Sequence, residues 1–441
     1  MTKQMKFIIN GGKKLNGEIQ LAGAKNAATK MLVASILTSE PCVLENFPEI
    51  GDAQITQELC RSIGSEIKNG GGTMKIHTPE IKNAKVTSLS RRNRIPILAL
   101  GPLLARSGEA EVPILGGDKI GPRPVDIHIE ALTAMGAKIE VLPDRYVGSA
   151  PNGLHGATIN LRYPSVGATE NTILAAVLAS GRTVIQNAAV EPEVIDLVQM
   201  LQKMGAIIEL GVDRVITIDG VKELRGVTHR IMPDRNEAVS FACLAVATGG
   251  RILVKEARQD DLITFLNVLR RVGGDYEVKE GGILFFRPDR PGPEGGELFP
   301  AEIETDTHPG FMTDWQQPFA TLLTQARGQS TIHETVYEDR FGYAKDLNLM
   351  GAAIRVETKC LGGLTCRFKD KGFYHSAEIS GPTKLRGANL TVRDLRSGIA
   401  HVIAALIASG QSVIEGVEEL DRGYERIDER LRNLGADIQR I

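Results

Sequence analysis

Residues 168–210 read ATENTILAAVLASGRTVIQNAAVEPEVIDLVQMLQKMGAIIEL and contain the repeating unit from which the whole fold can be predicted. An apolar run of helical length, ILAAVLAS, follows a polar start, and the β-branched run RTVIQNA comes next. After a turn that contains proline, Leu197, Met200, Leu201 and Met204 recur at the spacing of an amphipathic helix. The stretch therefore predicts a helix, a strand, a second helix and a final strand, in that order.

Six copies of this pattern follow one another along the chain. They begin near Lys25, Arg94, Ala168, Pro233, Thr313 and Arg393. Chance similarity among ordinary α/β segments is the alternative, but six copies in register disfavour it. Six such units predict an α/β protein of two lobes, with three copies in each lobe.

The first helix of each copy is unusually apolar, as in ILAAVLAS, VIAALIAS and MLVASILTS. A helix that is apolar nearly all round is buried, so we expect helices inside each lobe and sheets outside. The polar residues that open these helices are Lys25, Asn26, Arg94, Glu170, Asn171, Asp234, Arg235, Asp314, Arg393 and Asp394. Helix N-termini favour anionic ligands. The pattern therefore favours an enzyme that binds phosphate or carboxylate groups in a cleft between its lobes.

The composition argues against several other classes of protein. The 441 residues are 42% hydrophobic and carry a net charge of −2, which gives no electrostatic reason to expect nucleic acid or an anionic membrane as a partner. The apolar runs are too short for a signal peptide or a membrane span, so we expect a cytoplasmic protein. The five cysteines show no metal-ligand spacing, so we expect no metal and no cofactor. Cys360 and Cys366 flank LGGLT and could form a loop pair, but two buried packing residues are the preferred interpretation.

Several charged residues stand where chemistry could occur. Lys25 opens a buried helix, where a lysine is costly unless it meets an anion, although a surface position is the alternative. Asp314 could be a catalytic carboxylate or only a helix cap. Arginines recur at the polar ends of repeat elements, at Arg94, Arg123, Arg340, Arg396 and Arg422. Each alone fits a surface salt bridge, but together they suit a ligand with several anionic groups.

Residues 113–126, PILGGDKIGPRPVD, pose a separate question. Three glycines and three prolines in fourteen residues exclude a helix or a central strand. Asp118 follows a glycine pair in this segment. It could lie in a simple turn, or on a closable loop that carries a catalytic carboxylate.

Motifs spread over nearly the whole chain resemble those of the enolpyruvyl transferases, and within them the UDP-N-acetylglucosamine 1-carboxyvinyltransferases. They include GEIQLAGAKNAA, ALGPLLAR, the GG-x-x-IG-x-RPVD-x-H loop, PSVGATEN, NAAVEPEVIDL, HPGFMTDWQ, YEDRF and DRGYERI. The related 3-phosphoshikimate enolpyruvyl transferases match these motifs far less well. The resemblance implies a two-lobed inside-out α/β barrel of six repeats. Lobe one would comprise residues 24–232 and carry the Asp118 loop, and lobe two would combine residues 1–23 with 233–441.

The resemblance also implies an activity and a set of site residues. The enolpyruvyl group of phosphoenolpyruvate would pass to the 3′-hydroxyl of UDP-N-acetylglucosamine, with release of phosphate, in the first committed step of peptidoglycan synthesis. Lys25, Arg123 and Arg422 would hold phosphoenolpyruvate, Asp118 would be the general acid, and Asp314 would be the base. Residues implied to hold the UDP-sugar are Asn26, Arg94, Arg123, Pro124, Val125, Asp126, Ile127, Tyr163, Pro164, Ser165, Val166, Asp314 and Val336, while Arg340 and Arg396 would line the cleft.

The chain departs from the common family pattern at the loop acid. Most members have cysteine there, and that cysteine is the target of the epoxide antibiotic fosfomycin. Asp118 places this chain with the members that have aspartate, which predicts insensitivity to fosfomycin. Tyr163 and Pro164 also replace the Lys-Val of some members, so these two positions could contribute backbone contacts only.

Two alternatives remain open from the sequence. The chain could be an enolpyruvyl transferase with a different acceptor, although PSVGATEN and RPVDIH argue for a UDP-sugar. It could also be a catalytically silent paralogue that binds UDP-sugar as a regulator. Retention of Lys25, Asp314, Arg422 and an acid at position 118 argues against a silent protein.

Overall fold

The computed structural model describes residues 5–91, 93–114, 116, 124–289, 296–364 and 366–441. These residues form two compact units, each with its own hydrophobic core. We call the unit drawn from residues 23–232 lobe one, and the unit formed by residues 5–22 and 233–441 lobe two. None of the described helices combines the length and the apolar character that crossing a membrane would require.

Lobe one alternates helices with strands. Its helices are α1 (Lys25–Ala34), α2 (Gly51–Ile63), α3 (Leu100–Ser107), α4 (Asp126–Ala134), α5 (Val166–Ala176) and α6 (Pro192–Lys203), with 3₁₀ turns η1 (Ser35–Leu37) and η2 (Pro96–Ala99). Its strands are β3 (Cys42–Glu45), β4 (Glu66–Gly70), β5 (Thr73–His77), β6 (Glu109–Pro113), β7 (Lys138–Val141), β8 (Arg145–Ser149), β9 (Thr158–Asn160), β10 (Arg182–Gln186), β11 (Ile207–Leu210), β12 (Ile216–Asp219) and β13 (Thr228–Arg230).

Lobe two repeats the alternation and adds two strands from the start of the chain. Its helices are α7 (Arg235–Thr248), α8 (Ile263–Val272), α9 (Gln316–Leu323), α10 (Tyr343–Leu349), α11 (Leu395–Ile407) and α12 (Ile427–Asn433), with η3 (Thr313–Trp315) and η4 (Val417–Glu419). Its strands are β1 (Lys6–Asn10), β2 (Asn16–Gln20), β14 (Arg251–Lys255), β15 (Asp275–Lys279), β16 (Gly282–Phe286), β17 (Glu302–Glu304), β18 (Gly328–His333), β19 (Ala353–Glu357), β20 (Ser376–Gly381), β21 (Asn389–Thr391), β22 (Gln411–Glu415) and β23 (Asp437–Arg440).

The sheets confirm the sequence repeat, because one strand order recurs among them. Five of the sheets in the described residues have four strands, in which a parallel pair is followed by two antiparallel neighbours, as in β9-β10-β12-β11 and β17-β18-β20-β19. The sheet β6-β8-β7 has three strands. A parallel bridge between Lys85 and Glu111 takes the position that the fourth strand has in the other sheets. The expectation of six α/β units is confirmed.

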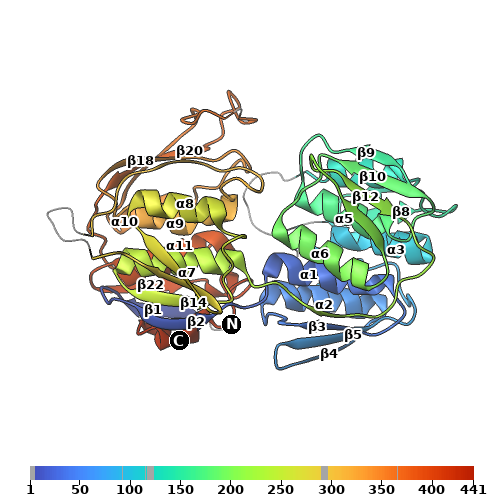
Figure 1. Ribbon diagram of the computed structural model, residues 1–441, viewed down its shortest axis with the longest axis horizontal. Helices are drawn as coiled ribbons and strands as arrows, with labels where there is room; N and C mark the ends of the chain where they lie inside the picture. The colour runs from blue at the N-terminus through green and yellow to red at the C-terminus, as the bar shows by residue number, and fades with distance from the viewer. Residues whose placement is uncertain (1–4, 92, 115, 117–123, 290–295, 365) are drawn as a thin grey trace. The chain divides into compact units, whose positions relative to one another are not determined.

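The first helix of each unit lies inside its lobe, as its apolar sequence predicts. All residues of α7 from Arg235 to Ala247 are buried, as are those of α5 from Ala168 to Ala176. In lobe two, α7, α9 and α11 contact one another, and in Figure 1 they lie between β18 and β20 on one side and β1, β2, β14 and β22 on the other. This arrangement leaves the starts of the inner helices as the places where polar residues enter the core.

One helix start differs from the sequence-based expectation. Helix α5 begins at Val166, capped by the Ser165 hydroxyl, which accepts a hydrogen bond from Ala168 N at 3.4 Å. Glu170 and Asn171 were expected to open this helix, but they lie one turn further in and are fully buried. The expectation placed the helix start just before the apolar run. It was wrong because the cap residue Ser165 lies earlier, and Gly167 and Ala168 already belong to the first turn of the helix.

Candidate functional site

Asp314 lies in the short turn η3, immediately before the inner helix α9. The turn is fixed from below by Trp315, whose ring centroid is 5.5 Å from that of Phe311 and 6.0 Å from that of Phe265, both in edge-on contact. The N-cap position of this turn is Met312, and Asp314 is the acidic residue of its first turn. An acidic side chain at a helix start is favoured by the helix dipole, so a structural role is compatible with this position.

Two buried arginines hold the Asp314 carboxylate. One oxygen pairs with Arg340 Nη2, and the other lies 3.1 Å from Arg396 Nη2. Burial acts to lower the pKa of both guanidinium groups, but the charge of Asp314 together with those of other neighbouring groups outweighs it and raises each pKa above its ordinary value. The Asp314 side chain is 16% exposed, against 3% for Arg340 and 5% for Arg396. Asp314 is thus a carboxylate held in orientation by two buried arginines, with a small part of its side chain exposed.

A second layer of polar contacts fixes Arg396. Its Nη1 donates to the Tyr424 hydroxyl at 3.4 Å, and that hydroxyl is 2.9 Å from Ser240 Oγ in α7. Burial raises the pKa of Tyr424 to about 12, so the phenol stays protonated. Arg422, two residues before Tyr424, pairs with Glu419 Oε2 at 2.9 Å and is nearly buried. The DRGY segment thus brings Arg422 and the support of Arg396 into one turn.

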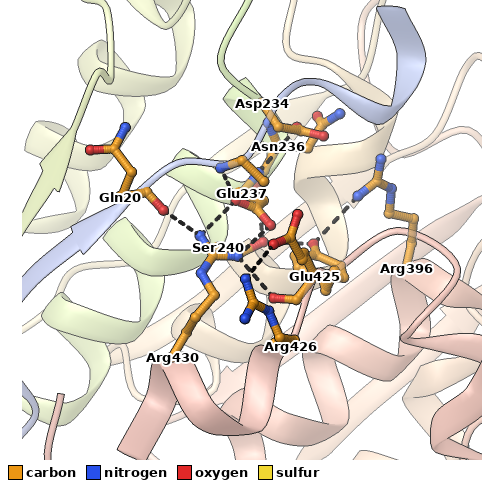
Figure 2. Close-up of polar contacts among 11 residues, drawn as sticks. Gln20, Asp234, Asn236, Glu237, Ser240, Arg396, Glu425, Arg426 and Arg430 are labelled. Atoms are coloured by element: carbon orange, nitrogen blue, oxygen red, sulfur yellow. Dashed lines mark hydrogen bonds and ion pairs between the residues drawn. The ribbon is translucent and has the colours of Figure 1, made fainter. Parts of the chain in front are cut away.

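Figure 2 shows the polar start of α7, where this layer continues. Asp234 caps the helix by accepting from the backbone N–H groups of Asn236 and Glu237. The buried carboxylate of Glu237 takes a fork of two bonds from Arg430, at 2.7 and 2.9 Å, and Arg430 also donates to Gln20 O at 2.7 Å. These contacts tie α12, the start of α7 and the end of β2 together, so that Ser240 and Tyr424 are held in register.

Glu334 is a residue that sequence analysis did not single out, and it organises the other side of Asp314. It is fully buried and accepts from Thr313 Oγ1 at 2.8 Å and from Gln316 Nε2 at 2.6 Å. Its second oxygen accepts from the N–H groups of Val336 and Tyr337. One carboxylate therefore sets the position of η3 and of the Val336 turn, which were both expected to contribute to the site.

In lobe one, Lys25 is the first residue of α1, as expected. Its ammonium group lies 2.9 Å from Asp52 Oδ2 in the first turn of α2, and both side chains are largely buried. This acidic neighbour could not be expected from the sequence, because Asp52 is 27 residues away. Lys25 is therefore a buried cation with a counter-ion, which stabilises it in the absence of any ligand.

Two segments that were expected to bind the UDP-sugar are joined through Arg162. Its guanidinium group pairs with Asp126 and lies 2.7 Å from Glu130, which fixes the first turn of α4 against the residues before α5. Pro124, Val125, Asp126 and Ile127 thereby lie near Tyr163, Pro164, Ser165 and Val166, and all of these are exposed or half-buried. The pairing leaves Asp126 with a partner inside the protein.

Buried His128 connects the same region to the Arg94 segment. Its Nδ1 lies 3.3 Å from Asn171 Nδ2, and that amide also donates to Ile97 O at 3.2 Å. Burial, assisted by the charge of Arg94, lowers the pKa of His128 to about 3, so the imidazole is neutral. Asp118 and Arg123, the candidate acid and a candidate substrate ligand, lie outside the described residues.

Glu170 gives lobe one a pH-dependent stability. Burial raises its pKa to about 7, although the charge of Lys30, 3.7 Å away, opposes the shift, and Glu193 and Glu191 add to it. Between pH 4.5 and 7 the folded protein holds a proton that the unfolded chain releases, so stability falls as the pH rises through this window. We expect Glu170→Gln to raise the free energy of unfolding by up to about 3 kcal/mol at pH 8, with little change near pH 4.5.

Urea unfolding of both proteins at a series of pH values would measure this difference. Glu140→Gln is the matched control, because Glu140 is exposed in the same lobe and should give no pH-dependent difference. A Glu170→Gln protein whose stability relative to the native protein does not change between pH 5 and 8 would contradict the expectation.

The comparisons with known proteins bear on this geometry. A family model described as EPSP synthase (3-phosphoshikimate 1-carboxyvinyltransferase) matches residues 9–431. The UDP-N-acetylglucosamine 1-carboxyvinyltransferase of Protochlamydia amoebophila is 48% identical over 98% of this chain and 94% of its own length. The chain belongs to the enolpyruvyl (1-carboxyvinyl) transferase family. The UDP-N-acetylglucosamine 1-carboxyvinyltransferase of Chlamydia pneumoniae is 51% identical over 97% of this chain and 93% of its own length.

The solved structures agree with membership of the enolpyruvyl transferases. The enolpyruvyl transferase NikO from Streptomyces tendae superposes with a TM-score of 0.85 at 23% identity, covering 99% of both chains. This likeness confirms the expected enolpyruvyl transferase fold. The family resemblance drawn from the sequence motifs is confirmed as well, and the protein is a transferase.

Some residues that build the site carry no sequence signal for an enolpyruvyl transferase. Arg162 and Glu334 support other side chains and stand in ordinary charged contexts, whereas Tyr424, which supports Arg396, lies within the DRGYERI motif but was given no role from it. Arg340 and Arg396 were expected to line a cleft. The structure shows that both pair with Asp314, which their positions in YEDRF and RDLRSG could not reveal.

Proposed function

We propose that the protein transfers the enolpyruvyl group of phosphoenolpyruvate to the 3′-hydroxyl of UDP-N-acetylglucosamine, with release of phosphate, for peptidoglycan synthesis. The observation that carries the proposal is the Asp314 carboxylate, held by Arg340 and Arg396 with a small part of its side chain exposed. The relatives that are named UDP-N-acetylglucosamine 1-carboxyvinyltransferase support the choice of acceptor.

The chemistry requires one base and one acid. Asp314 takes the proton of the sugar 3′-hydroxyl as the hydroxyl oxygen bonds to C2 of phosphoenolpyruvate, while an acid delivers a proton to C3. The intermediate carries both oxygen substituents on C2. Loss of the C3 proton then re-forms the double bond as the C2–O bond to phosphate breaks. We assign the acid to Asp118, which can deliver the C3 proton in the first half-reaction and remove it in the second.

The cations would hold the anionic groups of phosphoenolpyruvate. We assign this role to Lys25, Arg123 and Arg422. Lys25 and Arg422 each have a carboxylate neighbour, Asp52 and Glu419, so a bound phosphate or carboxylate would share these cations with the protein. Such sharing keeps the buried cations compensated before substrate arrives and after phosphate leaves.

The UDP-sugar would be held mainly by the segments that Arg162 joins. We assign binding to Asn26, Arg94, Pro124 to Ile127, Tyr163 to Val166 and Val336, with Arg123 and Asp314 completing the set. The start of α5 offers backbone N–H groups for a phosphate oxygen. Asp126 is paired with Arg162, and both side chains are about half exposed, so it can fix the segment and still reach a ligand.

Phosphate release is the measurement that tests this function. The native protein is expected to release phosphate from phosphoenolpyruvate only when UDP-N-acetylglucosamine is also present, with a product that carries the added carboxyvinyl group by mass. Release with another acceptor, such as 3-phosphoshikimate, and none with the UDP-sugar would show a shifted acceptor. Binding of the UDP-sugar without release under any pairing would identify a silent paralogue and refute the proposal.

Fosfomycin provides an independent prediction for the loop acid. The epoxide is opened by a thiolate, and a carboxylate is a much weaker nucleophile, so the native protein should keep full activity after incubation with the drug. Asp118→Cys should gain time-dependent inactivation, with an adduct that peptide mapping locates at position 118. The native cysteines provide the internal control, because they should remain unmodified. Inactivation of the native protein with an adduct at Asp118 would contradict the expectation.

A further inference from the structure

One end of the sheet β17-β18-β20-β19 in lobe two gathers four side chains that the transfer reaction does not use. His333 ends β18, His375 immediately precedes β20, and Cys360 and Cys366 come from the connection between β19 and β20. One ligand atom from each of the four lies within 4.8 Å of the other three. Both histidines are buried and both cysteines are half-buried, so the interpretation of the two cysteines as buried packing residues is wrong.

The hydrogen bonds of the two imidazoles show which ring nitrogen carries the hydrogen. His333 Nδ1 lies 2.9 Å from Glu304 Oε2, and His375 Nδ1 lies 2.7 Å from Phe373 O. A carboxylate and a carbonyl can only accept, so each Nδ1 carries the hydrogen. In the neutral imidazole each Nε2 then carries the lone pair, and that of His375 lies 3.3 Å from Cys360 Sγ. His333 Nε2 is buried and has no hydrogen-bond partner among the described residues.

Two imidazole lone pairs and two thiols form only weak hydrogen bonds with one another, but all four groups are good ligands for a metal cation. An imidazole nitrogen buried without a partner carries a desolvation cost that a bound metal ion removes. Histidines whose Nδ1–H is held by a carboxylate or a backbone carbonyl are the usual form of metal-ligating histidine. Both histidines of this cluster have that arrangement.

The separations are close to those of a tetrahedral site. Zinc lies about 2.0–2.1 Å from imidazole nitrogen and about 2.3 Å from thiolate sulfur, which places tetrahedral ligand atoms roughly 3.3–3.8 Å apart. Cys360 Sγ is 3.3 Å from His375 Nε2, within that range. The widest separation, 4.8 Å, requires a contraction of about 1 Å for the four atoms to share one ion.

The cysteine-bearing loop is closed over the cluster by backbone hydrogen bonds. Gly363 N and Leu364 N donate to Glu304 at 2.7 and 2.9 Å, and Phe368 N lies 3.3 Å from Cys366 Sγ. A Cβ at position 362 would approach Glu304 and His333 more closely than van der Waals contact allows, so only glycine fits there. Glu304 thus orients His333 and anchors the loop with the same carboxylate.

We propose that His333, Cys360, Cys366 and His375 bind one divalent cation of the zinc class, in a structural site separate from the transfer chemistry. Thiolate and imidazole ligands select zinc over magnesium or calcium, which require oxygen ligands. Four protein ligands leave no open coordination position, which is the mark of a structural site rather than a catalytic one. Binding would release the two thiol protons to solvent.

The sequence alone did not indicate this site, and we expected no metal from the cysteine spacing. His333 is far before the cysteine pair in the sequence, and His375 is nine residues after it. The register of β18 against β20 pairs His333 with Ser376, which is next to His375. Only the fold brings the four together.

The site has a structural consequence for the proposed substrate site, and this step rests on the proposed function. Arg367, which follows Cys366, donates to Val336 O and lies 3.9 Å from Glu338 Oε1. A metal that fixes Cys366 would therefore fix the segment that carries Val336 and leads to Arg340. Removal of the metal is expected to raise the KM for the UDP-sugar more than it lowers kcat.

Metal content of the full-length protein is the direct test, and it does not depend on activity. Protein purified in reducing buffer, incubated with Zn²⁺ and desalted is expected to retain about one zinc per chain. Replacement by Co²⁺ should give tetrahedral ligand-field bands and a thiolate-to-cobalt charge-transfer band. Cys360→Ser and His375→Ala should lose stoichiometric zinc, and Glu304→Ala should lower the affinity about 10–100-fold through loss of His333 orientation.

Two controls keep the test independent of misfolding. Cys243→Ala removes a buried cysteine outside the cluster and His155→Ala an exposed histidine, so both should retain zinc. Native protein that retains no zinc and shows no thiolate band with Co²⁺ would overturn the proposal. A Cys360–Cys366 disulfide in protein isolated without reductant, with no zinc uptake after reduction, would overturn it too. Native protein that binds no zinc but still releases phosphate would refute the metal site and leave the proposed function standing.

Discussion

Asp314→Asn is expected to lower kcat for phosphate release by about 10²–10⁴-fold, with a much smaller change in KM. The amide keeps the size of the carboxylate, but it cannot accept the proton of the sugar hydroxyl. Its NH2 group also cannot accept from an arginine, so only one of the contacts with Arg340 and Arg396 remains. We expect the remaining contact to hold the side chain near its native position, so that most of the loss in kcat comes from proton transfer.

The same substitution also removes the charge that compensates two buried guanidinium groups. Breaking a buried ion pair from one side costs about 3–5 kcal/mol, so thermal unfolding should be measured beside the kinetics. Asp306→Asn, an exposed aspartate eight residues earlier, is the matched control and should leave both unchanged. A folded Asp314→Asn protein with native kcat would refute the base assignment and leave Asp314 as a structural anchor for the arginines.

Asp118→Asn is expected to lower phosphate release by orders of magnitude, because an asparagine amide cannot protonate C3 of phosphoenolpyruvate. Lys119 and Arg123 follow Asp118 in the sequence, and nearby cations favour the ionised carboxylate. The negative charge of phosphoenolpyruvate and exclusion of water favour the protonated form instead. We therefore expect the acid to be protonated only when substrate is bound.

Comparison of the pH dependence of kcat and of kcat/KM tests this expectation for Asp118. The kcat profile reports groups in the substrate complex, and the kcat/KM profile reports groups in the free enzyme. Activity falls as the pH rises and the acid loses its proton, and we expect this fall at a higher pH in the kcat profile than in the kcat/KM profile. Asp144→Asn, at an exposed position of lobe one, is the control and should keep the native profile. Full activity in Asp118→Asn would return Asp118 to the role of a turn residue.

The fold could be predicted from the sequence because its signal is repeated. Each copy alone, such as residues 168–210, is an ordinary α/β segment, but the same order of apolar helix, strand and amphipathic helix recurs through the chain. Errors arose where one residue decides a boundary, as at Ser165, which caps α5 earlier than the apolar run suggests. Boundaries depend on single hydrogen bonds, whereas element type depends on periodicity over many residues.

The candidate site could be predicted only in part, for a related reason. Motifs locate residues such as Lys25 and Asp314, but not their partners, because Asp52, Arg340 and Arg396 reach them through tertiary folding. The structural interpretation of Asp314 as a helix-start residue was open from the sequence and stays open, because Asp314 lies in the first turn of η3. Supporting residues such as Glu334 contribute through geometry, which a composition or a spacing does not record.

The position of β1 has a consequence for how the protein folds during synthesis. This strand lies between β22 and β23, with Phe7 paired to Ile414 on one side and Arg440 on the other. At about 5–20 residues per second, the ribosome takes roughly 20–90 s to supply these partners after residue 10 has been made. Lobe one can complete its core meanwhile, whereas β1 waits with both edges unpaired. The apolar strand KFIIN is therefore the segment of a nascent chain that a chaperone would most need to cover.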